Sequence, residues 1–129
     1  MREKIKRYEL SDHINMYILS KNNFKRIEHE EEETFLKYHF SKELLDEITV
    51  HIDITINQDR KYIFDDQKDV ELFDEAFCHQ YRAFYDEDRD FPFLNDLIKE
   101  YNNTMDELVE KGVFKPKVLT KTKTLTKTK

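Results

Sequence analysis

The chain contains only one glycine, Gly112, and only one cysteine, Cys78, among its 129 residues. Loops that cradle phosphate groups need several glycines so that the backbone can approach the ligand, which excludes a nucleotide-binding loop of the usual form. One cysteine cannot form an internal disulfide, and this agrees with a reducing compartment. Long apolar runs are missing as well, so we see neither a signal peptide nor a membrane anchor and expect a cytoplasmic protein.

The familiar patterns of catalytic and metal-binding sites are also missing. Cys78 precedes His79, but the helix expected there would point these neighbours about 100 degrees apart, and we interpret Cys78 as a small buried residue. His51 and Asp53 lie on the polar face of one expected strand. They are either a weak metal-binding or acid–base pair or, as is more common, part of a solvated sheet face. We therefore expect no catalysis and no cofactor.

One acidic segment invites comparison with a calcium-binding loop. Asp86, Asp88 and Asp90 match the first three ligand positions of an EF-hand. The sixth position, which needs glycine for a sharp turn, is Phe91, and the twelfth, which supplies a bidentate glutamate, is Leu97. We therefore expect no metal site there and predict an exposed loop between two helices.

Charge is distributed unevenly along the chain. The six lysines after Phe114 belong to a total of 22 Lys and Arg, so the first 114 residues carry 16 of these against all 28 Asp and Glu, a formal charge of -12. A surface with this charge repels nucleic acid and attracts basic grooves. We expect the folded part to bind a positively charged protein surface and not nucleic acid directly. A surface that serves only solubility is the alternative.

The first part of the chain predicts one helix and two strands. A capping serine followed by apolar residues at helical spacing predicts a helix over residues 11–21. Residues 24–27 and 34–40 are expected to pair as strands, because apolar and polar residues alternate in the second of them. The acidic run 28–33 is interpreted as an exposed connection, and residues 41–47 stay unassigned between a helical turn and a loop.

Residues 48–57 form the clearest strand pattern of the sequence. One face is wholly apolar and the other wholly polar, which is typical of a half-buried strand. A turn-like segment over 57–60 leads into a returning strand over 61–64, so 48–64 is predicted to be an antiparallel hairpin. The apolar residues are Ile48, Val50, Ile52, Ile54 and Ile56.

Two amphipathic helices are expected after the hairpin. The first covers residues 70–84, and its apolar stripe predicts that Phe77→Ala costs roughly 3–5 kcal/mol, as truncation of a large core residue does. The second begins at Pro92 and ends before Gly112, which is expected to supply the left-handed conformation that stops a helix. The first stripe consists of Val70, Phe73, Phe77, Tyr81 and Phe84.

Together these elements predict an α+β fold with helices packed on one face of an antiparallel sheet of three to four strands, in the order α-β-β-β-β-α-α. Residues 1–114 are expected to form a single domain. Residues 115–129 are mostly lysine and threonine, which cannot bury an apolar face, and are expected to be a disordered tail.

Several short motifs, some of them acidic or aromatic, lie between residues 48 and 97. They are Ile48-Thr49, Ile54-Thr55-Ile56-Asn57 with Asp59, Tyr62-Ile63, Ala76-Phe77, Tyr85-Asp86-Glu87-Asp88 with Phe91, and Asn95-Asp96-Leu97. Over residues 48–97 this pattern resembles the small acidic phage anti-CRISPR proteins that inhibit the RNA-guided nuclease of type II-A systems. In that family a helix, a three-stranded antiparallel sheet and two helices present acidic loops to the nuclease.

The resemblance implies inhibition by mimicry of DNA. In the family, acidic residues enter the site that reads the PAM of duplex DNA, where arginines that recognise guanine can pair with a carboxylate. By position, Glu87 and Asp88 would face those arginines, and Tyr85 would support their loop. The chain departs from the family in the hairpin turn, where Arg60-Lys61 stand in place of a glycine and an acidic residue. The implied partner-binding residues are Asp59, Tyr85, Asp86, Glu87, Asp88 and Asp90.

The sequence therefore predicts a non-enzymatic phage or mobile-element inhibitor that blocks the PAM- and DNA-binding groove of a guide-RNA-loaded type II CRISPR nuclease. The first alternative is a small acidic interaction or regulatory module, monomeric or homodimeric, that is unrelated to CRISPR. The second is an enzyme that uses scattered carboxylates and histidines, with His51 and Asp53 as its best candidate pair.

Overall fold

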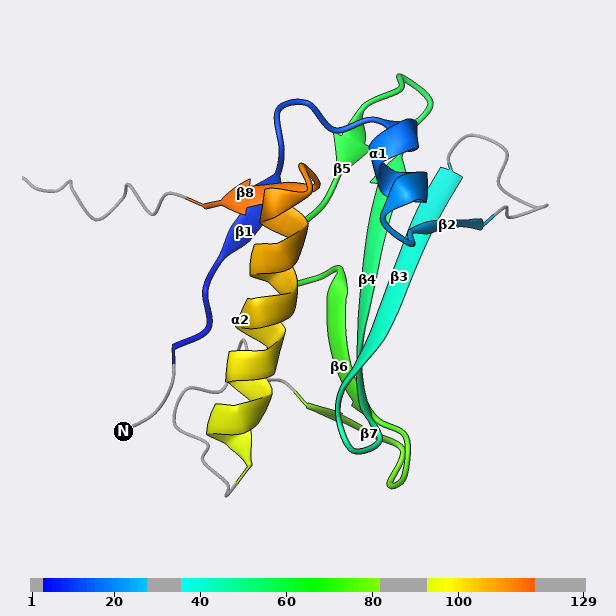
Figure 1. Cartoon of the computed structure of the whole chain (residues 1–129). Coiled ribbons are helices and arrows are strands. Elements are labelled where there is room, and N and C mark those ends of the chain that lie inside the picture. Colours follow the sequence, from blue (N-terminus) through cyan, green and yellow to red (C-terminus); the bar gives the residue numbers. More distant parts are fainter. Residues whose placement is uncertain (1–3, 28–35, 82–92, 118–129) are drawn as a thin grey trace, which may run out of the picture.

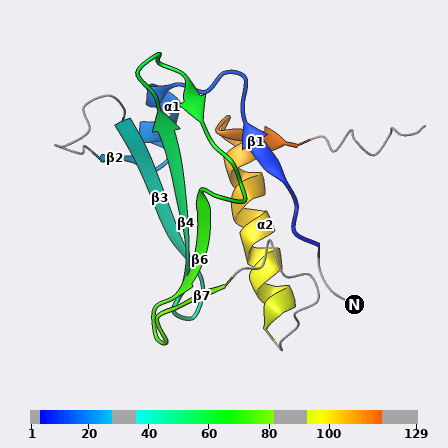
Figure 2. The same ribbon diagram turned by 180° about the vertical axis from the view of Figure 1, so that it is seen from behind.

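The computed structural model describes residues 4–27, 36–81 and 93–117. They form a mixed α+β fold in which a long helix, α2, lies along one face of an antiparallel sheet (Figure 1). Figure 2 shows the opposite side, where the strands of the sheet lie to the left of α2. The elements in chain order are β1 (Tyr8–Leu10), α1 (Met16–Lys21), β2 (Lys25–Ile27), β3 (Leu36–Leu45), β4 (Ile48–Ile56), β5 (Tyr62–Ile63), β6 (Val70–Asp74), β7 (His79–Tyr81), α2 (Leu94–Glu110) and β8 (Phe114–Pro116).

The main sheet has six strands in the order β2-β3-β4-β6-β7, with β5 paired to the end of β4 that β6 leaves free. This confirms the α+β class and the antiparallel sheet. The predicted number of three to four strands and the predicted element order are wrong. The four expected strands are present, and β6 and β7 are added where a helix was predicted.

A long β3–β4 hairpin forms the centre of the sheet. The five apolar residues of β4 are at most 5% exposed, and the polar residues between them are half-buried on the other face. β3 continues to Leu45 and turns at Asp46-Glu47, where Glu47 has a φ of 61°. Residues 41–47, unassigned from the sequence, are therefore mainly strand, because they complete the pairing with β4.

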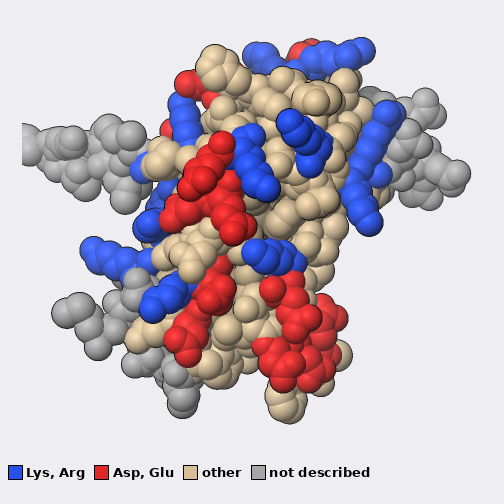
Figure 3. Space-filling model, in the orientation of Figure 1, with Lys and Arg blue, Asp and Glu red and all other residues tan. Residues whose placement is uncertain are grey.

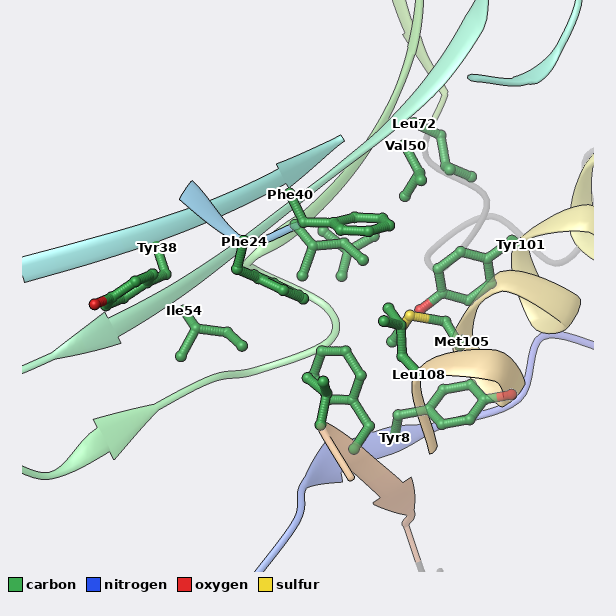
Figure 4. Packing of buried hydrophobic residues seen from close by; sticks show 14 of the residues in the cluster. Tyr8, Phe24, Tyr38, Phe40, Val50, Ile54, Leu72, Tyr101, Met105 and Leu108 are labelled. Carbon is green, nitrogen blue, oxygen red and sulfur yellow. The ribbon is translucent and has the colours of Figure 1, made fainter. Parts of the chain in front are cut away.

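The helix predicted between Pro92 and Gly112 is confirmed in its described part as α2. Its apolar stripe packs on the apolar face of the sheet, so that Tyr101 and Met105 share one core with Val50 and Leu72 (Figure 4). Gly112 follows the helix with a φ of 85°, the left-handed conformation expected at this position. α2 therefore supplies most of the cover that the sheet needs on that side.

α1 begins later than the sequence predicts. Its N-cap is Asn15, whose side-chain oxygen accepts a hydrogen bond from the N–H of Ile18 at 2.9 Å. Ser11, the predicted cap, donates its N–H to the carbonyl of Val113 at 3.0 Å instead. This bond ties the chain before α1 to the segment after α2, so only Met16–Lys21 of the predicted helix is helical.

The helix predicted over residues 70–84 is wrong in its described part. Residues 70–74 form β6, in which Val70 and Leu72 face the core, and residues 79–81 form β7. The carboxylate of Asp74 accepts hydrogen bonds from the N–H groups of Ala76 and Phe77 at 2.9 and 3.2 Å, which turns the chain between the two strands. The strands form because β4 has a second edge that needs a partner.

Phe77 and Cys78 consequently lie outside the core. Phe77 is 81% exposed, so the predicted cost of Phe77→Ala is wrong. Cys78 is also exposed, in the β6–β7 turn, and is not the buried residue that was predicted. Its φ of 52° places it in the left-handed region that tight turns use.

A two-stranded sheet joins the two ends of the described chain. β1 pairs antiparallel with β8, and the N–H of Lys117 donates to the carbonyl of Arg7 at 3.0 Å. β8 extends to Pro116, so the first residues of the predicted tail are a strand, and the rest, 118–129, lies outside the described residues. Strands of three residues are too short to show alternation in a sequence.

Candidate functional site

Two turns lie side by side at one end of the main sheet (Figure 1). They connect β3 to β4 and β6 to β7, and the N–H of Glu75 donates to the carbonyl of Glu47 across them at 2.8 Å. The exposed carboxylates of these turns and of the adjoining end of β3 are Glu43, Asp46, Glu47 and Glu75, which we call the acidic turn surface. Figure 3 shows acidic side chains gathered at this end of the molecule.

The two turns themselves contain no Lys or Arg, and the exposed Lys42, which precedes Glu43 on β3, has its Nζ 3.7 Å from Glu107 of α2. Residues 43–51 and 70–81 contain neither Lys nor Arg. Phe77 stands exposed in the same pair of turns. A large apolar side chain within a charged rim is a common anchor of protein–protein interfaces. The acidic turn surface thus combines a concentrated negative field with one apolar contact point.

A hollow of about 710 Å³ lies on the polar face of the sheet, beside the acidic turn surface. We call it the histidine hollow, because His39 and His51 belong to its lining. Acidic, amide and aromatic side chains complete the lining, together with one lysine. These other lining residues are Asp53, Gln67, Lys68, Asp69, Val70, Glu71, Phe73, Glu75, Gln80 and Tyr81.

The two histidines form a chain of polar contacts between two carboxylates. Asp53 lies directly opposite His39 in the β3–β4 pairing, and its Oδ1 is 2.7 Å from His39 Nδ1. His39 Nε2 is 3.4 Å from His51 Nδ1, with the two rings stacked at a centroid distance of 5.3 Å. His51 Nε2 in turn is 3.7 Å from the Oε2 of Glu75.

The sequence singled out His51 and Asp53 as the pair, whereas the structure pairs Asp53 with His39. All three residues occupy the polar face, as the alternation of β3 and β4 predicts. His39 was missed because the sequence predicted 24–27 as a partner of the strand over 34–40 and did not predict its pairing with β4. The register of the β3–β4 hairpin was the signal that could have found it.

Asp69 at the histidine hollow has a perturbed pKa. Burial raises the pKa of this carboxyl, the charges of Asp65 and Asp53 raise it further, and a hydrogen bond from the Asp65 N–H at 2.8 Å opposes them. A raised pKa in the folded state means that the stabilising contribution is complete at acidic pH and is lost as pH rises through the raised value. Ionised Asp69 therefore destabilises the fold at neutral pH.

We expect Asp69→Asn to raise the thermal midpoint slightly at pH 7, because the amide oxygen can still accept the Asp65 N–H without carrying charge. The gain should disappear below about pH 4, where the wild-type carboxyl is itself neutral. Thermal unfolding followed by circular dichroism at several pH values checks this. Asp59→Asn, the same charge change at an exposed turn, is the control. If Asp69→Asn raised the thermal midpoint equally at pH 7 and below about pH 4, the raised pKa of Asp69 would be contradicted.

Of the partner-binding residues implied by the resemblance, only Asp59 is described. It is exposed in the β4–β5 turn, and its N–H donates to the side-chain oxygen of Asn57 at 2.9 Å. β4 has nine residues, so at about 3.3 Å per residue its two ends are roughly 25–30 Å apart. Asp59 thus lies far from the acidic turn surface. Tyr85, Asp86, Glu87, Asp88 and Asp90, and with them the EF-hand-like segment, lie outside the described residues.

Sequence reasoning did not single out the acidic turn surface. Its carboxylates come from the end of β3 and from two turns, and their proximity depends on the pairing of β4 with β6, where a helix was predicted. The absence of Lys and Arg from both segments was the available signal. In the described part of the chain no group of three or more His, Cys, Asp or Glu side chains is arranged to hold a metal ion.

Comparisons with protein-family models, with curated proteins and with solved structures found no match to this chain. The resemblance to the anti-CRISPR inhibitors therefore stays a prediction. None of the described helices has the length and apolar character needed to cross a membrane.

Proposed function

We propose that the protein is a non-enzymatic inhibitor that places its acidic turn surface in a basic, nucleic-acid-binding groove of another protein. The observation that carries this proposal is the meeting of two turns with four exposed carboxylates, no Lys or Arg, and one exposed aromatic, Phe77. The resemblance supplies the partner, which is the PAM-reading groove of a guide-RNA-loaded type II CRISPR nuclease.

The chemistry of such a groove fits carboxylates. Its arginines are arranged to bind guanine edges bidentately, and a carboxylate offers a guanidinium the same bidentate geometry. A concentrated negative field accelerates encounter with a basic groove and makes the association sensitive to salt. Exposed Phe77 supplies apolar contact that a charged surface alone lacks. Binding would therefore be steered by charge and anchored at the β6–β7 turn.

The test is cleavage of duplex DNA by a panel of guide-loaded type II nucleases, with the protein added before or after the DNA. We expect inhibition only when the protein is added first, because it competes for the DNA-reading site. Glu47→Lys/Glu75→Lys, which cancels the formal charge of the four carboxylates of the acidic turn surface, should abolish it. The affinity of the protein for the nuclease should fall by at least tenfold between about 50 mM and about 500 mM salt.

Two further variants locate the binding surface. Asp96→Lys/Glu110→Lys makes the same change in net charge at exposed positions of α2 and should leave inhibition intact. Glu87→Lys/Asp88→Lys tests the loop that the resemblance implicates. Equal loss in the α2 variant would mean that net charge alone matters. An absence of inhibition across the panel would reject the CRISPR nuclease as partner, and an unbiased pull-down compared between wild type and Glu47→Lys/Glu75→Lys would then test the surface itself.

A homodimeric regulatory module is the second candidate, and exposed apolar residues on α1 favour it. Tyr17 is 71% exposed and Met16 41% exposed on this short helix. Light scattering separates the two proposals, since a stable dimer that is broken by Tyr17→Ser and shows no nuclease inhibition would support the module.

A further inference from the structure

Two histidines on neighbouring strands each aim one ring nitrogen at the other. His39 Nε2 and His51 Nδ1 are 3.4 Å apart. Two nitrogen ligands of one tetrahedral zinc ion, each at 2.0–2.1 Å from the metal, are separated by about 3.3–3.4 Å. The spacing thus fits a metal ion shared between the rings as well as it fits a shared proton.

The outer nitrogens of the same rings face carboxylates. Asp53 Oδ1 lies 2.7 Å from His39 Nδ1, and Glu75 Oε2 lies 3.7 Å from His51 Nε2. A histidine that binds a metal almost always gives its other N–H to such an acceptor, which fixes the tautomer and makes the ligating nitrogen more basic. With protons on both outer nitrogens, the two inner lone pairs face each other, and a cation between them removes their repulsion.

The surroundings allow an ion to enter and hold the ligands in place. The side chains of His39 and His51 are 30% and 28% exposed and line the histidine hollow, so both rings can be reached from it. Both residues lie within paired strands, β3 and β4, and not in a loop. Ligands on regular elements keep their geometry better than ligands on loops.

We propose that His39 Nε2 and His51 Nδ1 bind one divalent transition-metal ion of the Zn²⁺, Ni²⁺ or Cu²⁺ class, with Asp53 and Glu75 as outer partners. Imidazole nitrogen suits these ions, whereas Mg²⁺ and Ca²⁺ prefer oxygen. Because no third ligand of the usual kind joins them in the described residues, the remaining positions open into the hollow for water or for a donor group of a bound partner. This site goes beyond the proposed inhibition and does not depend on it.

The first experiment is a ZnCl₂ titration of the full chain, purified without a polyhistidine tag, followed by NMR of the histidine rings and by calorimetry. We expect saturable binding of one ion per chain, with the ring signals of His39 and His51 changing together and those of His13 and His79 unchanged. MgCl₂ should produce no such change. Absence of saturable binding up to millimolar Zn²⁺ would overturn the proposal.

Matched variants separate direct ligation from general folding. His39→Gln and His51→Gln should each weaken Zn²⁺ binding by at least tenfold, and His79→Gln, at an exposed position on β7, should not. Asp53→Asn should weaken it by about 10–100-fold while both rings still shift, as loss of an outer partner does. Unchanged far-ultraviolet circular dichroism checks each fold. If His39→Gln and His51→Gln bound Zn²⁺ as tightly as the wild type, the ion would bind elsewhere. The same would follow if His79→Gln weakened Zn²⁺ binding as much as they do.

Discussion

Replacing Asp66 with alanine is expected to lower the free energy of unfolding by about 3–5 kcal/mol, because it leaves a partly buried charge without its partner. The side chain of Asp66 is fully buried and accepts two hydrogen bonds from the Arg7 guanidinium, at 2.7 and 2.8 Å. It also accepts the N–H of Tyr8 at 2.9 Å. One carboxylate thus holds β1 against the segment that leads into β6.

Urea unfolding measures this loss of unfolding free energy, and two further variants serve as controls. Asp66→Asn keeps an oxygen for the Tyr8 N–H but removes the charge, so its loss should be smaller than that of Asp66→Ala. Asp12→Ala breaks the exposed contact of Asp12 with Lys115 and should leave the midpoint unchanged, because exposed ion pairs contribute little. Equal midpoints for Asp66→Ala and Asp12→Ala would contradict the structural role of the buried pair.

Phe114→Ala is expected to destabilise the fold by about 3–5 kcal/mol, whereas Phe77→Ala should be nearly neutral. Phe114 is 1% exposed, and its ring lies 4.8 Å from that of Phe64 and 6.4 Å from that of Phe24. It therefore connects β8 with two other parts of the core. The ring of Phe77 is in the β6–β7 turn and 81% exposed.

This matched pair of substitutions discriminates between two folds. A helix over 70–84 that covers the sheet would make Phe77→Ala the costly change, whereas the β6–β7 hairpin makes it almost free. Thermal and urea unfolding of both variants give the ranking. A larger loss in Phe77→Ala than in Phe114→Ala would refute the hairpin.

The elements that the sequence predicted correctly have local residue patterns that fit only one type of secondary structure. β4 alternates strictly between apolar and polar residues over its length, which only a half-buried strand requires. α2 has a long apolar stripe and a following Gly112 in the left-handed conformation. Neither pattern needs information from a distant part of the chain.

The segment over 70–84 shows why the rest was not predictable. Its apolar residues recur at helical spacing, and Phe73 and Asp74 break the alternation of apolar and polar residues that a strand would show. In the structure Val70, Leu72 and Asp74 are nevertheless buried on one face of β6, because the edge of β4 favours the strand. Tertiary contacts therefore decide between helix and strand in this segment. The candidate site shares this dependence, because both the acidic turn surface and the His39–Asp53 contact arise from the neighbours of β4, and a single strand cannot reveal its neighbours.

The pairing of β1 with β8 determines the order in which the fold can be completed during synthesis. Tyr8 and its partner Pro116 are 108 positions apart. At about 5–20 residues per second a ribosome needs roughly 5–20 s to produce that stretch, and β1 has no strand partner in this interval. Asp66 emerges about halfway, so the carboxylate that receives Arg7 and the Tyr8 N–H is available long before β8. Asp66 can therefore meet Arg7 and the Tyr8 N–H before β8 has been made, whereas β1 gains its strand partner only afterwards.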